Sequence, residues 1–268
     1  MVTASDTAAP ILETRDLTIS FGGLVAVNGV DLRLARSEVM CIIGPNGAGK
    51  STLFNLISGI YRPTRGQVLF DGQDITGKPV HRIAAIGIAR TFQSSRLFND
   101  LTLLDNVLIG MHTRTRSGVL DALLRPGRAR AELDAAAERA EAILHGLSPA
   151  LHARRNTLAG ALPQADRRRL EIARALASEP KVIMLDEPSS GMDDRDTDAL
   201  IGDVRRVMAE KPGLSFLIIE HDMRLVATLP DRVTVIDYGS KIAEGDYADI
   251  RVMPRVQEAY LGQRAANA

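Results

Sequence analysis

The sequence contains a single cysteine, no tryptophan and no apolar run that approaches the length of a membrane-spanning helix. Cys41 lies inside an apolar segment, so a disulfide framework is excluded and the thiol is expected in the core. A spanning helix needs roughly 20 apolar residues, so we expect a soluble protein whose link to any membrane goes through a partner. Residues 1–10 have neither a basic start nor an apolar run, so we expect this stretch not to be a signal peptide.

Excess charge of one sign is also absent. The chain has 33 Lys and Arg residues and 33 Asp and Glu residues, so its formal net charge is zero. This balance gives no support for a general nucleic-acid surface, and we expect no nucleic-acid partner. With 268 residues, the chain is long enough for one large domain with a subdomain and a full apolar core.

A glycine-rich stretch at 44–52 organises the rest of the chain. The pattern is Gly, four residues, then Gly-Lys-Ser, and the strand-like run 39–43 precedes it while Leu53, Leu56 and Ile57 follow at helical spacing. Glycine permits backbone conformations that let N–H groups surround a phosphate, and a helix N-terminus adds its positive dipole end. The predicted nucleotide-binding residues are Gly44, Pro45, Asn46, Gly47, Ala48, Gly49, Lys50, Ser51 and Thr52.

Patterns along the chain predict an α/β fold with two additions to its core. Alternating residues at 11–20 and 30–34 predict an antiparallel β subdomain. A strand is expected at 88–92, buried strands at 181–185, 214–219 and 233–236, and a helix at about 194–209. Residues 94–178 predict an inserted helical subdomain. Its last helix is expected to start at Asp166. Its longest helix, 128–146, is expected to bury one apolar stripe, formed by Ala129, Leu133, Ala136, Ala140 and Ile143. The expected organisation is a flexible tail at 1–10, one domain at 11–262 and a tail at 263–268.

Polar residues follow several of the predicted strands. Ligands bind at the carboxyl ends of parallel strands, and Gln93, Asp186, Glu187 and His221 all fall at such ends. Asp186 after an apolar run is suited to hold Mg²⁺ beside Ser51, and Glu187 is suited to orient and deprotonate a water. His221 is placed to hydrogen-bond a terminal phosphate.

Together these motifs resemble the nucleotide-binding subunits of ABC transporters, over about residues 11–262. GPNGAGKST at 44–52 is similar to the Walker A motif of this P-loop NTPase family, and IMLDEP at 183–188 is similar to the Walker B motif with its catalytic glutamate. The resemblance implies that Gln93 takes part in catalysis and in Mg²⁺ binding, that His221 is the switch histidine, and that Phe21 stacks on adenine. It implies a D-loop at Ser190, Gly191, Met192 and Asp193.

Within that family the chain resembles the ATPase subunits of branched-chain amino-acid importers, through FGGLVAVNGVDL, GIARTFQSSRLFNDLTLLDNV, RRLEIARALA and AYLG. The resemblance implies ATP and Mg²⁺ as cofactors, a second ATPase subunit, two membrane permeases, and a solute-binding protein outside the membrane. It places the chain peripherally on the cytoplasmic side of the inner membrane.

The signature loop departs from the family pattern. This loop, which acts on the nucleotide of the opposite subunit, aligns with Leu162, Pro163, Gln164, Ala165 and Asp166. Relatives often have Tyr-Gly where this chain has Gln164-Ala165, and loss of the glycine is expected to hinder the backbone's approach to phosphate.

Four readings remain open from the sequence. The first is an ATPase for an importer of branched-chain amino acids or related amides, and the second is the ATPase of a lipopolysaccharide-type exporter. The third is a mainly ATP-binding subunit with weak hydrolysis, which the altered signature loop permits. The fourth, an ABC protein that acts on ribosomes or DNA, usually carries two cassettes or a long coiled coil, and this chain has neither.

Overall fold

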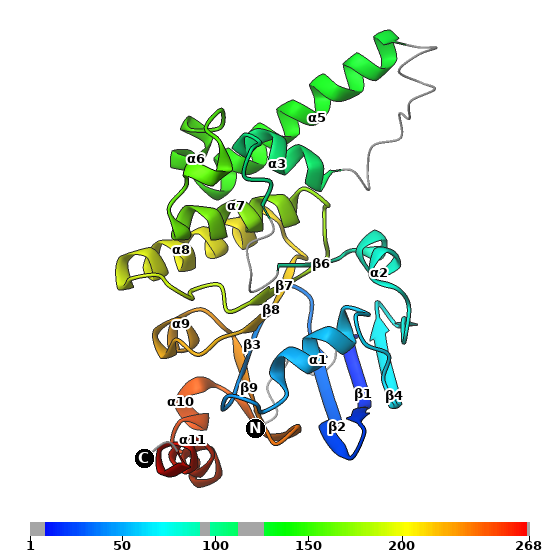
Figure 1. Ribbon diagram of the computed structural model, residues 1–268, viewed down its shortest axis with the longest axis vertical. Coiled ribbons are helices and arrows are strands. Elements are labelled where there is room, and N and C mark those ends of the chain that lie inside the picture. The colour runs from blue at the N-terminus through cyan, green and yellow to red at the C-terminus, as the bar shows by residue number, and fades with distance from the viewer. Residues whose placement is uncertain (1–8, 92–96, 112–125, 267–268) are drawn as a thin grey trace. The chain divides into compact units, whose positions relative to one another are not determined.

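The computed structural model describes residues 9–91, 97–111 and 126–266 (Figure 1). The chain divides into two compact units. Unit 1 comprises Met1–Arg90, Lys181–Ser190 and Pro212–Ala268, and unit 2 comprises Thr91–Pro180 and Gly191–Lys211. Among the described residues, no helix combines the length and apolar character required to cross a bilayer.

Unit 1 contains two sheets. The first is antiparallel with strand order β2-β1-β4-β5, formed by β1 (Leu12–Phe21), β2 (Leu24–Leu34), β4 (Arg65–Phe70) and β5 (Gln73–Asp74). The second has the order β10-β9-β3-β8-β7-β6 and is parallel except for β10. Its strands are β3 (Val39–Ile43), β6 (Ile88–Arg90), β7 (Val182–Asp186), β8 (Ser215–Ile219), β9 (Arg232–Asp237) and β10 (Ser240–Gly245).

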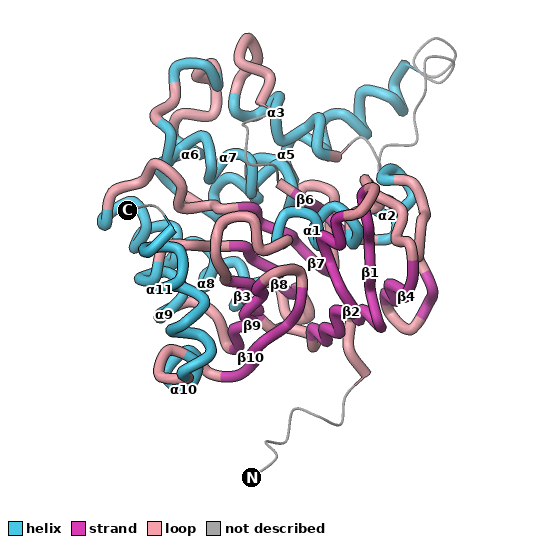
Figure 2. Tube along the Cα trace, turned by 60° about the horizontal axis from the view of Figure 1, so that its bottom comes forward, coloured by secondary structure: helices cyan, strands magenta, loops and turns pink. Residues whose placement is uncertain are grey.

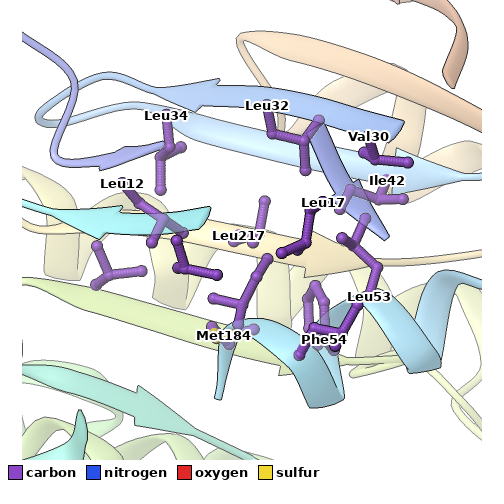
Figure 3. Packing of buried hydrophobic residues seen from close by; sticks show 14 of the residues in the cluster. Leu12, Leu17, Val30, Leu32, Leu34, Ile42, Leu53, Phe54, Met184 and Leu217 are labelled. Carbon is purple, nitrogen blue, oxygen red and sulfur yellow. The ribbon is translucent and has the colours of Figure 1, made fainter. Parts of the chain in front are cut away.

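Every residue of β3, β7 and β8 is buried, as expected for strands at the centre of a parallel sheet. Helix α1 (Lys50–Ile57) shares one apolar core with both sheets, and Figure 2 shows the strands around it in magenta. Leu53 and Phe54 of α1 belong to the same buried cluster as Leu12 and Leu17 of β1 and Met184 of β7 (Figure 3). The remaining helices of this unit are α2 (Val80–Ile86), α9 (Met223–Thr228), α10 (Tyr247–Ile250) and α11 (Pro254–Ala266).

The described part of unit 2 is helical. It contains α3 (Leu103–Gly110), α5 (Pro126–Leu147), α6 (Pro149–Ala153), the short 3₁₀ helix η1 (Ala159–Ala161), α7 (Gln164–Leu176) and α8 (Asp194–Glu210). Thr102 and Asp105 form a capping box at the start of α3. Unit 2 thus covers the region where helices are predicted and also includes α8, which follows the Walker B-like segment in the chain.

Two predicted boundaries are wrong. Helix α7 starts at Gln164 rather than Asp166, because Pro163, with φ −58° and ψ 160°, already takes the non-helical conformation of its N-cap. The strand expected at 88–92 ends at Arg90. Helix α11 runs from the predicted domain into the predicted tail at 263–268, as far as Ala266.

The apolar stripe of α5 also differs from its prediction. Leu133 is 67% exposed, whereas Ala136, Ala140, Leu144 and Leu147 are buried. The buried residues of this helix among those described therefore lie between Ala136 and Leu147. Helices α3, α6, α7 and α8 contact α5.

Candidate functional site

Three parallel strands of unit 1 end together at one edge of the six-stranded sheet. Ile42 of β3 and Asp186 of β7 both pair with Ile219 of β8. The backbone N–H of Glu187 donates to Ile219 O at 2.9 Å, and the N–H of Glu220 donates to Ile42 O at 3.3 Å. The segments that follow these three strands therefore start side by side, as expected for a ligand-binding edge.

The glycine loop after β3 contains two positions where only glycine fits. A Cβ atom at Gly44 would lie 2.0 Å from Ile236 O, and one at Gly49 would lie 2.3 Å from Ala26 O. Both residues have positive φ, at 152° and 101°. Gly49 is also the N-cap of α1, so the loop ends at a helix N-terminus, the position where backbone N–H groups and the helix dipole favour an anion.

Lys50, the first residue of α1, is 8% exposed and lies against the loop. Its Nζ donates to Gly44 O at 2.6 Å and to Pro45 O at 2.8 Å. Burial lowers the pKa of Lys50, and the carboxylates of Glu187 and Asp186 oppose that shift in part. A buried ammonium beside the glycine loop supplies the positive charge that phosphates would require.

Asp186 closes β7 and is 5% exposed. Its Oδ2 accepts a 2.9 Å hydrogen bond from Nη2 of Arg90, the last residue of β6. The next residue, Glu187, has a φ of 49°, an unusual conformation for a glutamate and one that is found more often at functional sites.

His221 lies near Glu187 and is held by the buried residue Glu220. Its Nδ1 is 3.9 Å from Oε1 of Glu187 and 3.8 Å from Oε2 of Glu220, and its side chain is 60% exposed. Glu220, which is fully buried, accepts hydrogen bonds from the backbone N–H groups of Ser189, His221 and Asp222. One carboxylate thus fixes the start of the His221 segment and the segment that follows Glu187.

Phe21 ends β1 and is 46% exposed. Its ring makes an edge-to-face contact with Tyr61, with ring centroids 5.3 Å apart and an interplanar angle of 74°. This contact orients the aromatic side chain while leaving surface to which a flat ring can stack.

The predicted signature loop lies in unit 2, at the start of α7. Gln164 and Ala165 form its first turn, and Ala165 is 6% exposed. Asp166 accepts hydrogen bonds from Arg154 and Arg169 at 2.9 and 3.1 Å. Ala165 is not among the described residues with positive φ, so the backbone conformation in this structure does not itself demand glycine there.

The donor set fits a magnesium ion held mainly by phosphates. The described residues contain no group of three or more His, Cys, Asp or Glu side chains that would form an all-protein metal site. Mg²⁺ is typically bound by one or two carboxylates together with substrate phosphates, and Asp186 with the exposed hydroxyl of Ser51 provides such a partial set. When bound, Mg²⁺ would neutralise phosphate charge.

Not all predicted site residues are brought together. Gln93 lies outside the described residues. The predicted D-loop crosses the boundary between units, with Ser190 in unit 1 and Gly191, Met192 and Asp193 in unit 2. The loop residues of 44–52 together with Asp186, Glu187 and His221 all belong to unit 1.

Arg90 and Glu220 are not among the site residues predicted from the sequence. Arg90 is the last residue of the short strand β6, and Glu220 directly follows the apolar strand β8. A charged residue at such a position is expected to be buried only with partners. That position was the available signal, but it does not identify the partners.

The region that contains the glycine loop, Asp186 and Glu187 matches a known protein family. A family model described as "ABC transporter" matches residues 27–190, more than half of the chain. The chain belongs to the ABC transporter family. A second model, described as "Branched-chain amino acid ATP-binding cassette transporter", matches residues 240–266. The predicted family is therefore confirmed.

Two relatives within this family match nearly the whole chain. BraF of Pseudomonas aeruginosa, a high-affinity branched-chain amino acid transport ATP-binding protein, is 42% identical over 95% of this chain and 98% of its own length. LivG of Escherichia coli, described in the same words, is 40% identical with the same two coverages.

Solved ABC cassettes share the fold. A nucleotide-free ATP-binding cassette from an ABC transporter is 33% identical, with a TM-score of 0.80 over 93% of this chain and 98% of its own. The ADP conformation of an ATP-binding cassette is also 33% identical, with a TM-score of 0.81 over 95% and 100% of the two chains. The predicted fold class is thus confirmed.

Proposed function

We propose that this chain is the ATP-binding and ATP-hydrolysing subunit of a membrane importer for branched-chain amino acids or related amides. The observation that carries the proposal is the sheet edge of unit 1, where the glycine loop and Lys50 lie beside Asp186 and Glu187. The printed names of BraF and LivG support the solute class.

The proposed chemistry is the reaction of ATP with water to give ADP and inorganic phosphate. The loop N–H groups and Lys50 bind the phosphates, Ser51 and Asp186 hold the Mg²⁺ ion, and Phe21 stacks on the base. Glu187 accepts a proton from the attacking water while the bond between the terminal phosphate and ADP breaks. His221 donates to the terminal phosphate. Gln93, which lies outside the described residues, is assigned to Mg²⁺ binding and catalysis by the family resemblance alone.

The proposed partners follow from the family. A second ATPase subunit supplies the signature loop to this chain's nucleotide, two permeases form the membrane path, and an extracytoplasmic solute-binding protein delivers the solute. Several exposed apolar side chains of unit 2 support a permease contact there, namely Phe98, Leu101, Ile109 and Leu158. Leu97 does not belong to this set, because it is 8% exposed. The proposed place is the cytoplasmic side of the inner membrane.

The test is solute uptake in cells that lack the gene. We expect uptake of labelled leucine, isoleucine or valine to fall, to be restored by the parent chain, and not to be restored by Lys50→Ala. Lys78→Ala is the matched control, because Lys78 is exposed outside the predicted phosphate loop. Unchanged uptake with defective outer-membrane lipopolysaccharide would instead support the exporter reading, which the family matches do not favour.

A further inference from the structure

Arg90 connects three elements around the carboxylate of Asp186. Its Nη2 donates to Asp186 Oδ2 at 2.9 Å, and its Nη1 donates to Asn55 Oδ1 at 2.7 Å and to Ser58 Oγ at 2.8 Å. Asn55 belongs to α1 and Ser58 is its C-cap residue. The guanidinium therefore ties the helix that follows the glycine loop to the carboxylate at the end of β7.

This contact is buried and stacked. The side chains of Arg90 and Asp186 are 8% and 6% exposed, and the guanidinium carbon lies 5.4 Å from the centre of the Phe54 ring. A buried ion pair is weak evidence for stability, since desolvation offsets much of the attraction. The geometry of the Arg90–Asp186 pair is better explained by the positions in which Arg90 holds the Asp186 carboxylate and helix α1.

Strand register puts the two charged groups together. Arg90 pairs with Met184 on the neighbouring parallel strand, and residues 184 and 186 point to the same face of the sheet because side chains alternate. That face also carries α1, whose Phe54 shares the core with Met184 (Figure 3). Arg90 is also the last residue of the first segment of unit 1, three positions before Gln93 in the sequence.

The hydrogen-bond pattern requires arginine. Two nitrogens at the end of a planar fork reach Asp186 on one side and Asn55 and Ser58 on the other. A lysine ammonium at this position carries the same charge but is a single point, so it cannot span both sides with the same geometry.

We infer that Arg90 is a positioning residue for the site, a role that rests on the proposed ATPase function. It binds one carboxylate oxygen of Asp186 and couples that carboxylate to α1. The second oxygen, Oδ1, is thereby held in one orientation relative to Lys50 and Ser51 at the start of the same helix. Arg90 itself does not contact the reacting atoms in this proposal.

The test compares nucleotide binding with and without Mg²⁺. A fluorescent ATP analogue is bound to the purified full chain first in EDTA and then across a Mg²⁺ titration. For Arg90→Lys we expect the half-maximal Mg²⁺ concentration to rise about tenfold, because a charge-assisted contact is lost. Affinity in EDTA is expected to change less than about threefold, since the glycine loop and Lys50 remain.

Asn55→Ala is the second variant, and Arg65→Lys is the matched control. Asn55→Ala removes one anchor of the guanidinium and keeps its pair with Asp186, so a smaller shift in the same direction is expected. Arg65 pairs with Asp16 on the surface, with both side chains more than half exposed, so its replacement is expected to leave the Mg²⁺ titration unchanged.

Three outcomes overturn the inference. A folded Arg90→Lys variant with the parent's Mg²⁺ dependence would assign Arg90 a structural role only. If Arg90→Lys does not fold, a parent-like titration for Asn55→Ala would give the same answer. Failure of the parent chain itself to bind the analogue would instead reject the proposed function, and with it the role of Arg90.

Discussion

At the scale of single residues, Lys50 is a buried ammonium whose pKa lies below the ordinary value for lysine, 10.5. Phosphates favour the charged form, so affinity falls as the pH rises through the pKa of the nucleotide-free state. Because that pKa is lowered, we predict that nucleotide affinity starts to decline at a lower pH than the pH at which an ordinary lysine loses its proton. The measurement is equilibrium binding of a fluorescent nucleotide between about pH 7 and 10.

The sign of this effect is checked with two arginine substitutions. Arginine stays protonated throughout this range, so Lys50→Arg is expected to flatten the alkaline decline, even if its affinity at neutral pH is lower. Lys78→Arg, at an exposed position, is expected to keep the parent profile. A parent whose affinity is constant up to the ordinary pKa of lysine would contradict the prediction.

Glu187 is the residue to which we assign proton transfer from water. Glu187→Gln keeps the shape of the side chain and removes the base, so we predict that ATP turnover in the assembled transporter falls about 10²–10⁴-fold. ATP binding is expected to persist, because the loop and Lys50 are unchanged. ATP turnover is measured as phosphate release, and ATP binding is measured as nucleotide retained after gel filtration.

The matched control is Glu138→Gln, which changes an exposed glutamate of α5. It is expected to hydrolyse ATP at the parent rate. If Glu187→Gln also hydrolyses ATP at the parent rate, the assignment of Glu187 is wrong.

At the scale of elements, Glu220 joins two loops that follow neighbouring strands. Its carboxylate accepts three backbone N–H groups, from Ser189, His221 and Asp222. In Glu220→Gln one oxygen becomes an NH₂ donor that faces other donors, and the loss of charge-assisted hydrogen bonds costs about 1.5–3 kcal/mol each. We predict a melting temperature lower by several degrees, at roughly 2–4 °C per kcal/mol.

Hydrogen exchange separates this local effect from a general loss of stability. The amides of Ser189, His221 and Asp222 are expected to exchange faster in Glu220→Gln under native conditions. Glu258→Gln, at an exposed position of α11, serves as the control. Unchanged melting and unchanged exchange at these three amides would show that the carboxylate is dispensable.

At the scale of the whole molecule, the signature loop is expected to act on the nucleotide that the partner subunit binds. Gln164 and Ala165 begin α7, where no side chain caps the helix. We predict that two paired copies of this chain hydrolyse ATP slowly, and that pairing with a different ATPase subunit concentrates hydrolysis at this chain's own Walker A motif. The double substitution Gln164→Tyr with Ala165→Gly is expected to raise turnover of the self-paired protein at least about tenfold.

The prediction is tested by measuring ATP turnover and the unfolding temperature of each variant. Turnover is compared alone and with a partner ATPase, and Gln164→Tyr alone is the control because it retains Ala165. Glycine in a helix costs up to about 1 kcal/mol relative to alanine, so the unfolding temperature is recorded for each variant. Equal turnover of parent and double variant in both settings would mean that the altered loop has no functional consequence.

Features that depend on near neighbours in the chain could be predicted from the amino-acid sequence. The loop at 44–52, the apolar strands before Asp186 and His221, and helix α8 all follow from local patterns that fold locally. The family and the fold class follow as well, because the order of the motifs along the chain is itself a sequence property.

Contacts between residues far apart in the chain could not be predicted, because they depend on how the strands are arranged in space. Arg90 and Asp186 are 96 positions apart, and Ser189 and Glu220 are 31 apart. Their pairing depends on the strand order β8-β7-β6 and its register, which no local pattern encodes. The exposure of Leu133 has the same origin, since an apolar residue at helical spacing is buried only where another helix covers it.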